Sequence, residues 1–128
     1  MWDAQAIDDL TEAVVTRLLV HGEPARVIAV DLAAELAQVR PGLPALSLAL
    51  PFALAAGAIE EMLGAGQQAR RAARDAWRVS ALIGIEVLGL RQQGDETIAG
   101  LWALWRAGDE VFGPAGTAQP GVPGPEIP

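Results

Sequence analysis

The chain has 128 residues, which is enough for one domain with a hydrophobic core and too few for a second. Its net charge of −7 argues against binding to a nucleic-acid backbone, because such binding needs clustered positive charge. It contains no cysteine, which excludes disulfides, thiolate catalysis and cysteine-ligated metal sites.

The first predicted helix begins after Asp3, a suitable N-cap residue. Trp2, just before this cap, can pack on Ile7 as a hydrophobic staple. The apolar stripe at helical spacing consists of Ile7, Leu10, Val14 and Leu18. Gly22 ends the helix. The acidic residues of this segment are atypical of an export signal, which has a basic start, so we expect a cytoplasmic protein.

The second predicted helix starts at Pro24, because proline suits the first helical position. Its apolar stripe consists of Ile28, Leu32, Leu36 and Val39. Residues 26–30 are dense in β-branched side chains, so a short β-strand is the alternative there. We favour the helix because no second convincing strand exists to pair with this one. Pro41 and Gly42 end the helix.

The third region runs from Pro44 to about Leu63 and overlaps a charge-free stretch, residues 41–59. This stretch has nearly the length of a membrane-spanning helix, but Pro44 and Pro51 interrupt it and many of its residues are small. We therefore expect a buried helix or a broken helical hairpin instead of a membrane span. Because proline cannot donate a backbone hydrogen bond, a kink or break is expected near Pro51.

A long helix is predicted over residues 67–93, with Gly94 as its stop. Its first half is rich in arginine, whereas its second half, residues 79–90, is nearly all apolar apart from Ser80 and Glu86. A helix that is apolar on all sides is a buried helix. We therefore expect protein to surround the second half almost completely.

The last predicted helix is capped by Asp95 and Glu96. Its expected buried side chains are Ile98, Leu101, Trp102, Trp105 and Phe112. Residues 113–128 are rich in proline and glycine and carry one charge, so we expect a flexible tail. The sequence thus predicts an all-α protein, with a compact bundle of about five helices over residues 1–112 and a disordered tail over residues 113–128.

The chain offers few residues for catalysis or metal binding. His21 is the only histidine, and its position before a helix-ending glycine is explained by the helix dipole. Adjacent carboxylates on a helix point in different directions, and the pairs of this kind are Glu60-Glu61, Asp95-Glu96 and Asp109-Glu110. Ser47 and Ser80 lie in no nucleophile motif and are expected to bond to their own helix backbones. We predict no enzymatic activity and no catalytic, cofactor-binding or metal-binding residues.

The conspicuous polar feature is a row of arginines. Arg70, Arg74 and Arg78 recur every four residues and share one helix face, where they can contact an anion or an acidic partner. The alternative is internal pairing, in which Asp75 pairs with Arg71 and Arg78 and the acidic first helix meets the other arginines.

Two tryptophans are possible interface anchors. Trp102 and Trp105 lie three residues apart on one helix surface. Core packing is the alternative for at least one of them. The chain is also unusually apolar, at 52% before its 14 glycines are counted, which favours self-association or a permanent partner.

We hypothesise a non-catalytic helical interaction or assembly protein without a cofactor: an adaptor, an accessory subunit or a homo-oligomer. The alternative is a protein that binds an apolar small molecule or a membrane surface through residues 41–59 and the apolar half of the long helix. A weaker alternative is a DNA-associated regulator. That function needs a helix-turn-helix, yet the second predicted helix lacks a basic or amide-rich recognition face.

Overall fold

The computed structural model describes residues 3–62, 66–109 and 111–112. These residues form no strand and are mostly helical, so the predicted all-α fold is confirmed. The elements are α1 (Ala4–Leu19), α2 (Ala25–Val39), the short 3-10 helix η1 (Ala45–Leu48), α3 (Ala49–Glu60), α4 (Gln67–Gln93) and α5 (Ile98–Arg106). The predicted staple of Trp2 and the predicted tail over residues 113–128 lie outside the described residues.

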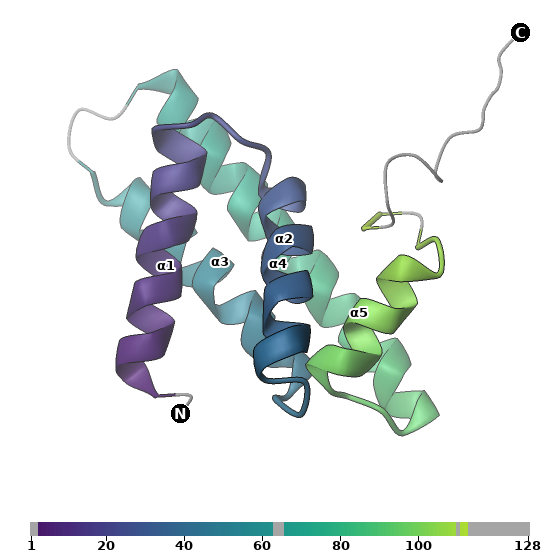
Figure 1. The fold of residues 1–128 in the computed structure, drawn as a ribbon. Coiled ribbons are helices and arrows are strands. Elements are labelled where there is room, and N and C mark those ends of the chain that lie inside the picture. The colour runs from purple at the N-terminus through teal and green to yellow at the C-terminus, as the bar shows by residue number, and fades with distance from the viewer. Residues whose placement is uncertain (1–2, 63–65, 110, 113–128) are drawn as a thin grey trace, which may run out of the picture.

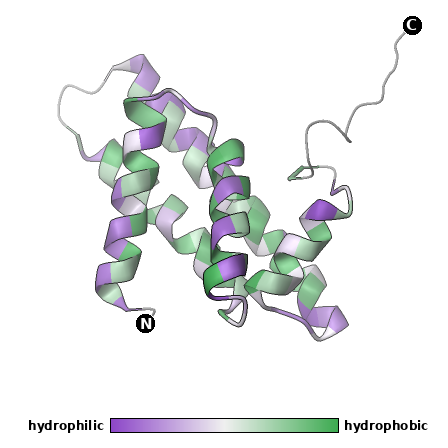
Figure 2. Ribbon diagram, in the orientation of Figure 1, coloured by the Kyte–Doolittle hydropathy of each residue, from purple (hydrophilic) through white to green (hydrophobic). Residues whose placement is uncertain are grey.

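The helices form two layers (Figure 1). α1 and α2 run side by side in opposite directions; α1 packs on α3, and α2 packs on α4 and α5. The most extensive contact between two elements joins α3 and α4, which form the second layer. Figure 2 shows hydrophilic and hydrophobic residues alternating along α1 and α2. The second layer has its own outward side, turned away from α1 and α2.

Local signals set the ends of α1 and α4 as predicted. The Asp3 side chain accepts a hydrogen bond from the backbone N–H of Ala6 at 2.9 Å and so caps α1. Gly22 and Gly94 follow α1 and α4 with φ angles of 63° and 78°, which glycine adopts without the penalty that a side chain adds.

The predicted cap of α5 is wrong by one or two residues. The N-cap residue is Thr97, whose hydroxyl accepts a hydrogen bond from the backbone N–H of Gly100 at 3.1 Å. The same hydroxyl donates to Asp95 at 2.7 Å. A threonine hydroxyl can accept and donate at once, so Thr97 caps α5 while Asp95 supports the cap by accepting from the same hydroxyl.

The region around Pro51 is broken as predicted. η1 ends at Leu48, and α3 begins at Ala49, which places Pro51 in the first turn of α3, where its missing N–H costs no hydrogen bond. Residues 41–59 are therefore a loop, a 3-10 turn and a short helix. Among the described residues, no helix combines the length and the apolar character needed to cross a membrane.

Residues 26–30 are helical, so the alternative of a β-strand there is wrong. These residues belong to α2, and their buried members are Ile28 and Ala29. A strand needs a partner, whereas α2 packs on α4 and α5, buries Ile28 completely and Val30 partly, and leaves Val27 exposed.

The core explains the abundance of alanine. Many fully or almost fully buried residues at helix contacts are alanines: Ala25, Ala29, Ala33, Ala45, Ala55, Ala56, Ala73 and Ala76. Small side chains let neighbouring helices approach closely. Larger residues fill the centre, and among them Phe52, Trp105 and Phe112 have no exposed surface.

Two linkers are tied together by backbone hydrogen bonds. Pro44 and Thr97 form an isolated antiparallel bridge between the segment before η1 and the segment before α5. Beside it, the N–H of Ala45 donates to Glu96 at 2.6 Å, and the N–H of Ile98 donates to Leu43 at 2.8 Å. The N-terminal end of α5 is thereby fixed to the end of the first layer.

Candidate functional site

The outward side of the second layer exposes large apolar side chains. We call this surface the α3–α4 apolar face; it consists of Leu46, Leu50, Leu54, Trp77, Ile85 and Leu88. Each of these side chains is between 44% and 64% exposed. Single exposed leucines are normal on a protein surface, but a contiguous apolar patch marks a site of interaction.

Two hydrogen bonds place both halves of this face on one side of the molecule. The Ser80 hydroxyl donates to the backbone oxygen of Ala49 at 3.1 Å, and the Trp77 indole N–H donates to the Glu60 carboxylate at 3.0 Å. These bonds join one flank of α3 to one flank of α4. At about 100° per residue, the exposed leucines of α3 and the exposed residues of α4 lie just beyond these flanks, away from the first layer. The prediction that Ser80 bonds to its own helix is therefore wrong.

The apolar half of α4 is not surrounded by protein, contrary to prediction. Val79, Ile83 and Val87 are buried against the other helices, but Ile85 is 64% exposed and Leu88 is 56% exposed. The other four α-helices cover only one side of α4. The side that stays bare has no charged residue between Arg78 and Arg91 except Glu86, which turns toward α5.

Comparisons with known protein families, proteins and structures give no match for this chain. It matches no protein-family model, no curated protein and no solved structure. The surfaces of the molecule therefore have to be interpreted from their own chemistry.

The predicted arginine row lies on the N-terminal half of α4. Arg70, Arg74 and Arg78 are exposed on the side that continues into Trp77 and Ile85. The predicted internal pairing does not occur: among the described residues, no salt bridge involves Arg70, Arg71, Arg74 or Arg78. Two acidic residues of the first layer and its linker pair instead with Arg17, which contacts Glu23 at 2.5 Å and Asp31 at 2.6 Å.

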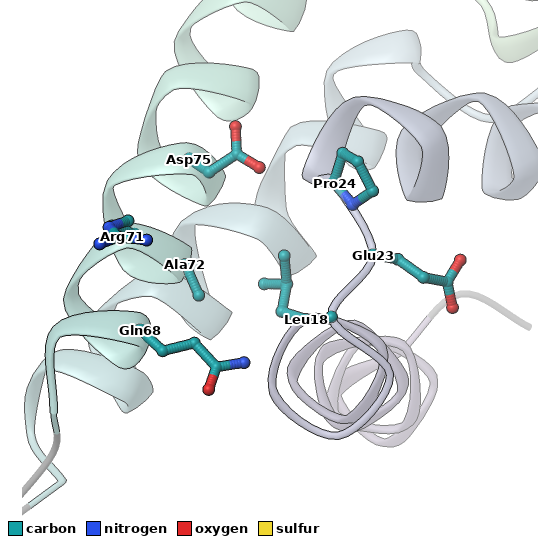
Figure 3. Close-up of a pocket in the computed structure, with 8 residues that line it drawn as sticks. Leu18, Glu23, Pro24, Gln68, Arg71, Ala72 and Asp75 are labelled. Carbon is teal, nitrogen blue, oxygen red and sulfur yellow. The ribbon is translucent and has the colours of Figure 1, made fainter.

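Asp75 has a different role from the predicted one. Its carboxylate accepts a hydrogen bond from the backbone N–H of Ala25 at 2.8 Å, across the bundle. Pro24 offers no capping side chain, so Asp75 of α4 satisfies the N-terminus of α2 and interacts favourably with its dipole. Figure 3 shows Asp75 directed toward Pro24, with Arg71 one turn away on the same helix.

Shallow hollows surround Asp75. One of about 320 Å³ lies between the end of α1, the start of α2 and α4, and its lining includes Leu18, Pro24, Arg71 and Asp75 (Figure 3). Another, of about 180 Å³, is lined by Arg71, Arg74, Asp75 and Arg78. A carboxylate in the middle of these arginines disfavours a small anion. Their mixed, charged lining also does not suit an apolar ligand.

The tryptophans predicted as interface anchors differ in exposure. Trp105 is fully buried and serves the core, whereas Trp102 is half-buried. Trp77 is the tryptophan with 44% of its surface exposed, and sequence reasoning missed it. The available signal was its spacing of four residues from Ala81 and eight from Ile85, which continues one helix face.

A second residue that sequence reasoning missed is Glu86. Its carboxylate accepts a hydrogen bond from the indole N–H of Trp105 at 2.5 Å. Partial burial, together with a hydrogen bond shared with Asp109, raises the pKa of Glu86 to about 7. Asp109 in turn accepts hydrogen bonds from the backbone N–H groups of Val111 and Phe112, both at 3.0 Å.

This carboxyl pair organises the end of the bundle. The Phe112 ring stacks on Trp105 with ring centroids 4.2 Å apart. Glu86 and Asp109 thus fix the position of both aromatic rings, and neither carboxylate lines the hollows around Asp75. His21 is exposed. Among the described residues, no group of three His, Asp or Glu side chains is placed to hold a metal ion.

Proposed function

We propose that this chain is a non-catalytic helical interaction or assembly protein and that the α3–α4 apolar face is its binding surface. The observation that supports this proposal most directly is the bare side of α4, with Ile85 64% and Leu88 56% exposed in a segment that is nearly all apolar. Covering such a surface with another protein removes apolar area from water, and the gain is about 25 cal/mol per Å².

The composition of this face resembles that of binding surfaces. Its centre is aliphatic and contains one tryptophan, a residue type enriched among the side chains that dominate binding energy. The arginine row borders it at the N-terminal half of α4 and supplies a polar rim. The guanidinium group of arginine is planar and can donate two parallel hydrogen bonds to a carboxylate of a partner.

The alternative function is binding to a membrane surface through the same leucines. Leu46, Leu50 and Leu54 form an exposed row at spacing of four residues, and such a row next to arginines is also found in helices that lie in a lipid interface. The acidic net charge of −7 opposes attraction to anionic lipid. We therefore place a protein partner first.

The proposal is tested by charging the face. In the face variant, Leu54→Glu and Leu88→Glu are combined; in the control variant, Val20→Glu and Val39→Glu change two side chains that are also exposed but lie elsewhere. We expect the face variant to weaken self-association or partner capture by about 30-fold or more, equivalent to about 2 kcal/mol. The control variant should behave as the wild-type chain does.

The measurements are sedimentation velocity of the purified chains, affinity capture from the native host with mass spectrometry, and flotation with vesicles of neutral and anionic phospholipid. Circular dichroism establishes that each variant is folded. Equal association of all three chains would contradict the proposal. Flotation that the face variant alone loses would favour the membrane alternative.

A further inference from the structure

We infer that the short turn after α5 is a pH-dependent contact, held on the bundle while two carboxyl groups share a proton and released when both are ionised. We call it the Phe112 turn; its described members are Asp109, Val111 and Phe112. This inference concerns the end of the bundle and does not depend on the α3–α4 apolar face.

The Phe112 turn is attached to the bundle through an aromatic stack. Phe112 has no exposed surface, and its ring lies on that of Trp105 with a centroid distance of 4.2 Å and an angle of 19° between the ring planes. Burial of the ring removes apolar surface from water, so the stack favours the attached position. Release of the turn would uncover Trp105, which is also fully buried.

One carboxyl group holds each ring of this stack. Glu86 on α4 accepts a hydrogen bond from the indole N–H of Trp105 at 2.5 Å, and Asp109 accepts from the backbone N–H groups of Val111 and Phe112, both at 3.0 Å. The two carboxyl groups also share a hydrogen bond with each other. Because ionised carboxylates can only accept, that bond needs one proton between them.

The proton is bound more tightly when the turn is attached. Partial burial and the contact with Asp109 raise the pKa of Glu86 to about 7, from an ordinary value of 4.5. Release of the turn removes the contact with Asp109 and admits water, so the pKa of Glu86 falls toward its ordinary value. The contribution of the proton to the attached state is therefore complete below pH 4.5 and is lost as the pH rises through about 7.

Among the described residues, no salt bridge offsets the charge of Glu86 or Asp109. Glu60, the charged residue of α3, accepts from an indole N–H. Two cations have other partners: Arg17 pairs with Glu23 and Asp31, and Arg91 pairs with Glu96. The remaining charged residues of α1 and α2, apart from Arg26, are exposed: Asp8, Asp9, Glu12 and Glu35.

Two further cations lie near the turn without pairing with it. Arg26 of α2 and Arg78 of α4 line a hollow of about 250 Å³ together with Val111, and Asp75 lines the same hollow with the opposite charge. Arg106 of α5 is exposed. Repulsion between the two ionised carboxylates is therefore opposed by no ion pair. One of them is fixed within α4, so the Phe112 turn is the part that moves.

Fluorine magnetic resonance of the full chain tests this release, because the chain contains only two phenylalanines. With both labelled as 4-fluorophenylalanine, Phe112 reports on the turn and Phe52, which is fully buried in the core, is the internal reference. The chain unfolded in urea supplies the signal of a solvent-exposed ring. We expect the ratio of attached to released Phe112 to fall about tenfold between pH 5 and pH 8, the change that a pKa difference of about one gives.

Two amide variants identify the groups responsible. Glu86→Gln and Asp109→Asn keep the hydrogen-bond acceptors and remove one charge each, so both should keep Phe112 attached at pH 8. Glu35→Gln, at an exposed position of α2, is the control and should release the ring as the wild-type chain does.

Three results would overturn the inference. The first is a Phe112 signal that stays at its attached position at pH 8 in the wild-type chain. The second is a pH-dependent release that both amide variants retain, since another group would then cause it. The third is a Phe52 signal that moves together with that of Phe112, which would show opening of the whole core instead of the turn.

Discussion

At the scale of single residues, the polar contacts that matter join helices that are far apart in sequence. Asp75 on α4 caps α2, Ser80 on α4 bonds to α3, and Glu86 on α4 holds Trp105 on α5. Sequence reasoning assigned Asp75 and Ser80 to partners on their own helix, because local spacing is all that a sequence displays. Which residues face each other across two helices depends on the packing angle, which the spacing of one helix does not determine.

The raised pKa of Glu86 makes stability depend on pH. The carboxyl group of Glu86 ionises near pH 7 in the folded chain and at its ordinary value of 4.5 in the unfolded chain. Between these values the folded state holds a proton that the unfolded state has lost. The stabilisation that this group contributes is therefore fully present below pH 4.5 and is lost as the pH rises through about 7.

We expect Glu86→Gln to remove this pH dependence. Glutamine can still accept from Trp105 and donate to Asp109, as the protonated acid does. The variant should match the wild-type chain at pH 5 and exceed its free energy of unfolding at pH 8 by about 1 kcal/mol, a value reduced for the solvent exposure of the site. Urea unfolding followed by tryptophan fluorescence measures both. Glu12→Gln, at an exposed position of α1, is the control and should show no such difference between the two pH values.

At the scale of elements, helix ends and lengths were the most predictable features. The bounds of α4 agree with prediction at both ends because glycines flank it, and the break before α3 follows from the prolines. The cap of α5 was misassigned because Asp95, Glu96 and Thr97 are adjacent and two of them are common capping residues. Composition restricts the candidates for a cap, and geometry chooses among them.

Two glycines within helices differ in the space available for a side chain. A Cβ atom on Gly100 would lie 2.6 Å from the Asp95 side chain and 2.8 Å from its backbone oxygen, whereas one on Gly57 in α3 would meet nothing within 4 Å. We expect Gly100→Ala to lower the free energy of unfolding by about 1–3 kcal/mol. Gly57→Ala should raise it by about 0.5–1 kcal/mol through helix propensity.

Chemical denaturation at one fixed protein concentration measures both glycine variants, since association would change the apparent stability. If both substitutions change the free energy of unfolding equally, the Asp95–Thr97 turn can move aside for an added methyl group and does not constrain the start of α5.

At the scale of the whole molecule, the sequence predicted an all-α bundle but not which surface stays bare. The sequence identified the apolar half of α4 and predicted that protein surrounds it almost completely. Counting helices does not reveal that α1, α2, α3 and α5 all pack on one side of it. The exposed Trp77, Ile85 and Leu88 follow from this arrangement, and they are the residues on which the proposed function depends.

The bridge between Pro44 and Thr97 makes two loops behave as one unit. The backbone N–H groups of Ala45, Ile98 and Ala99 all donate hydrogen bonds from one loop to the other. Their acceptors lie more than 50 residues away along the chain. Neither loop can open without releasing the other. In native-state hydrogen–deuterium exchange, these three amides should therefore be protected to a similar degree and lose that protection together as denaturant is added, so that α5 and the start of η1 detach in a single event.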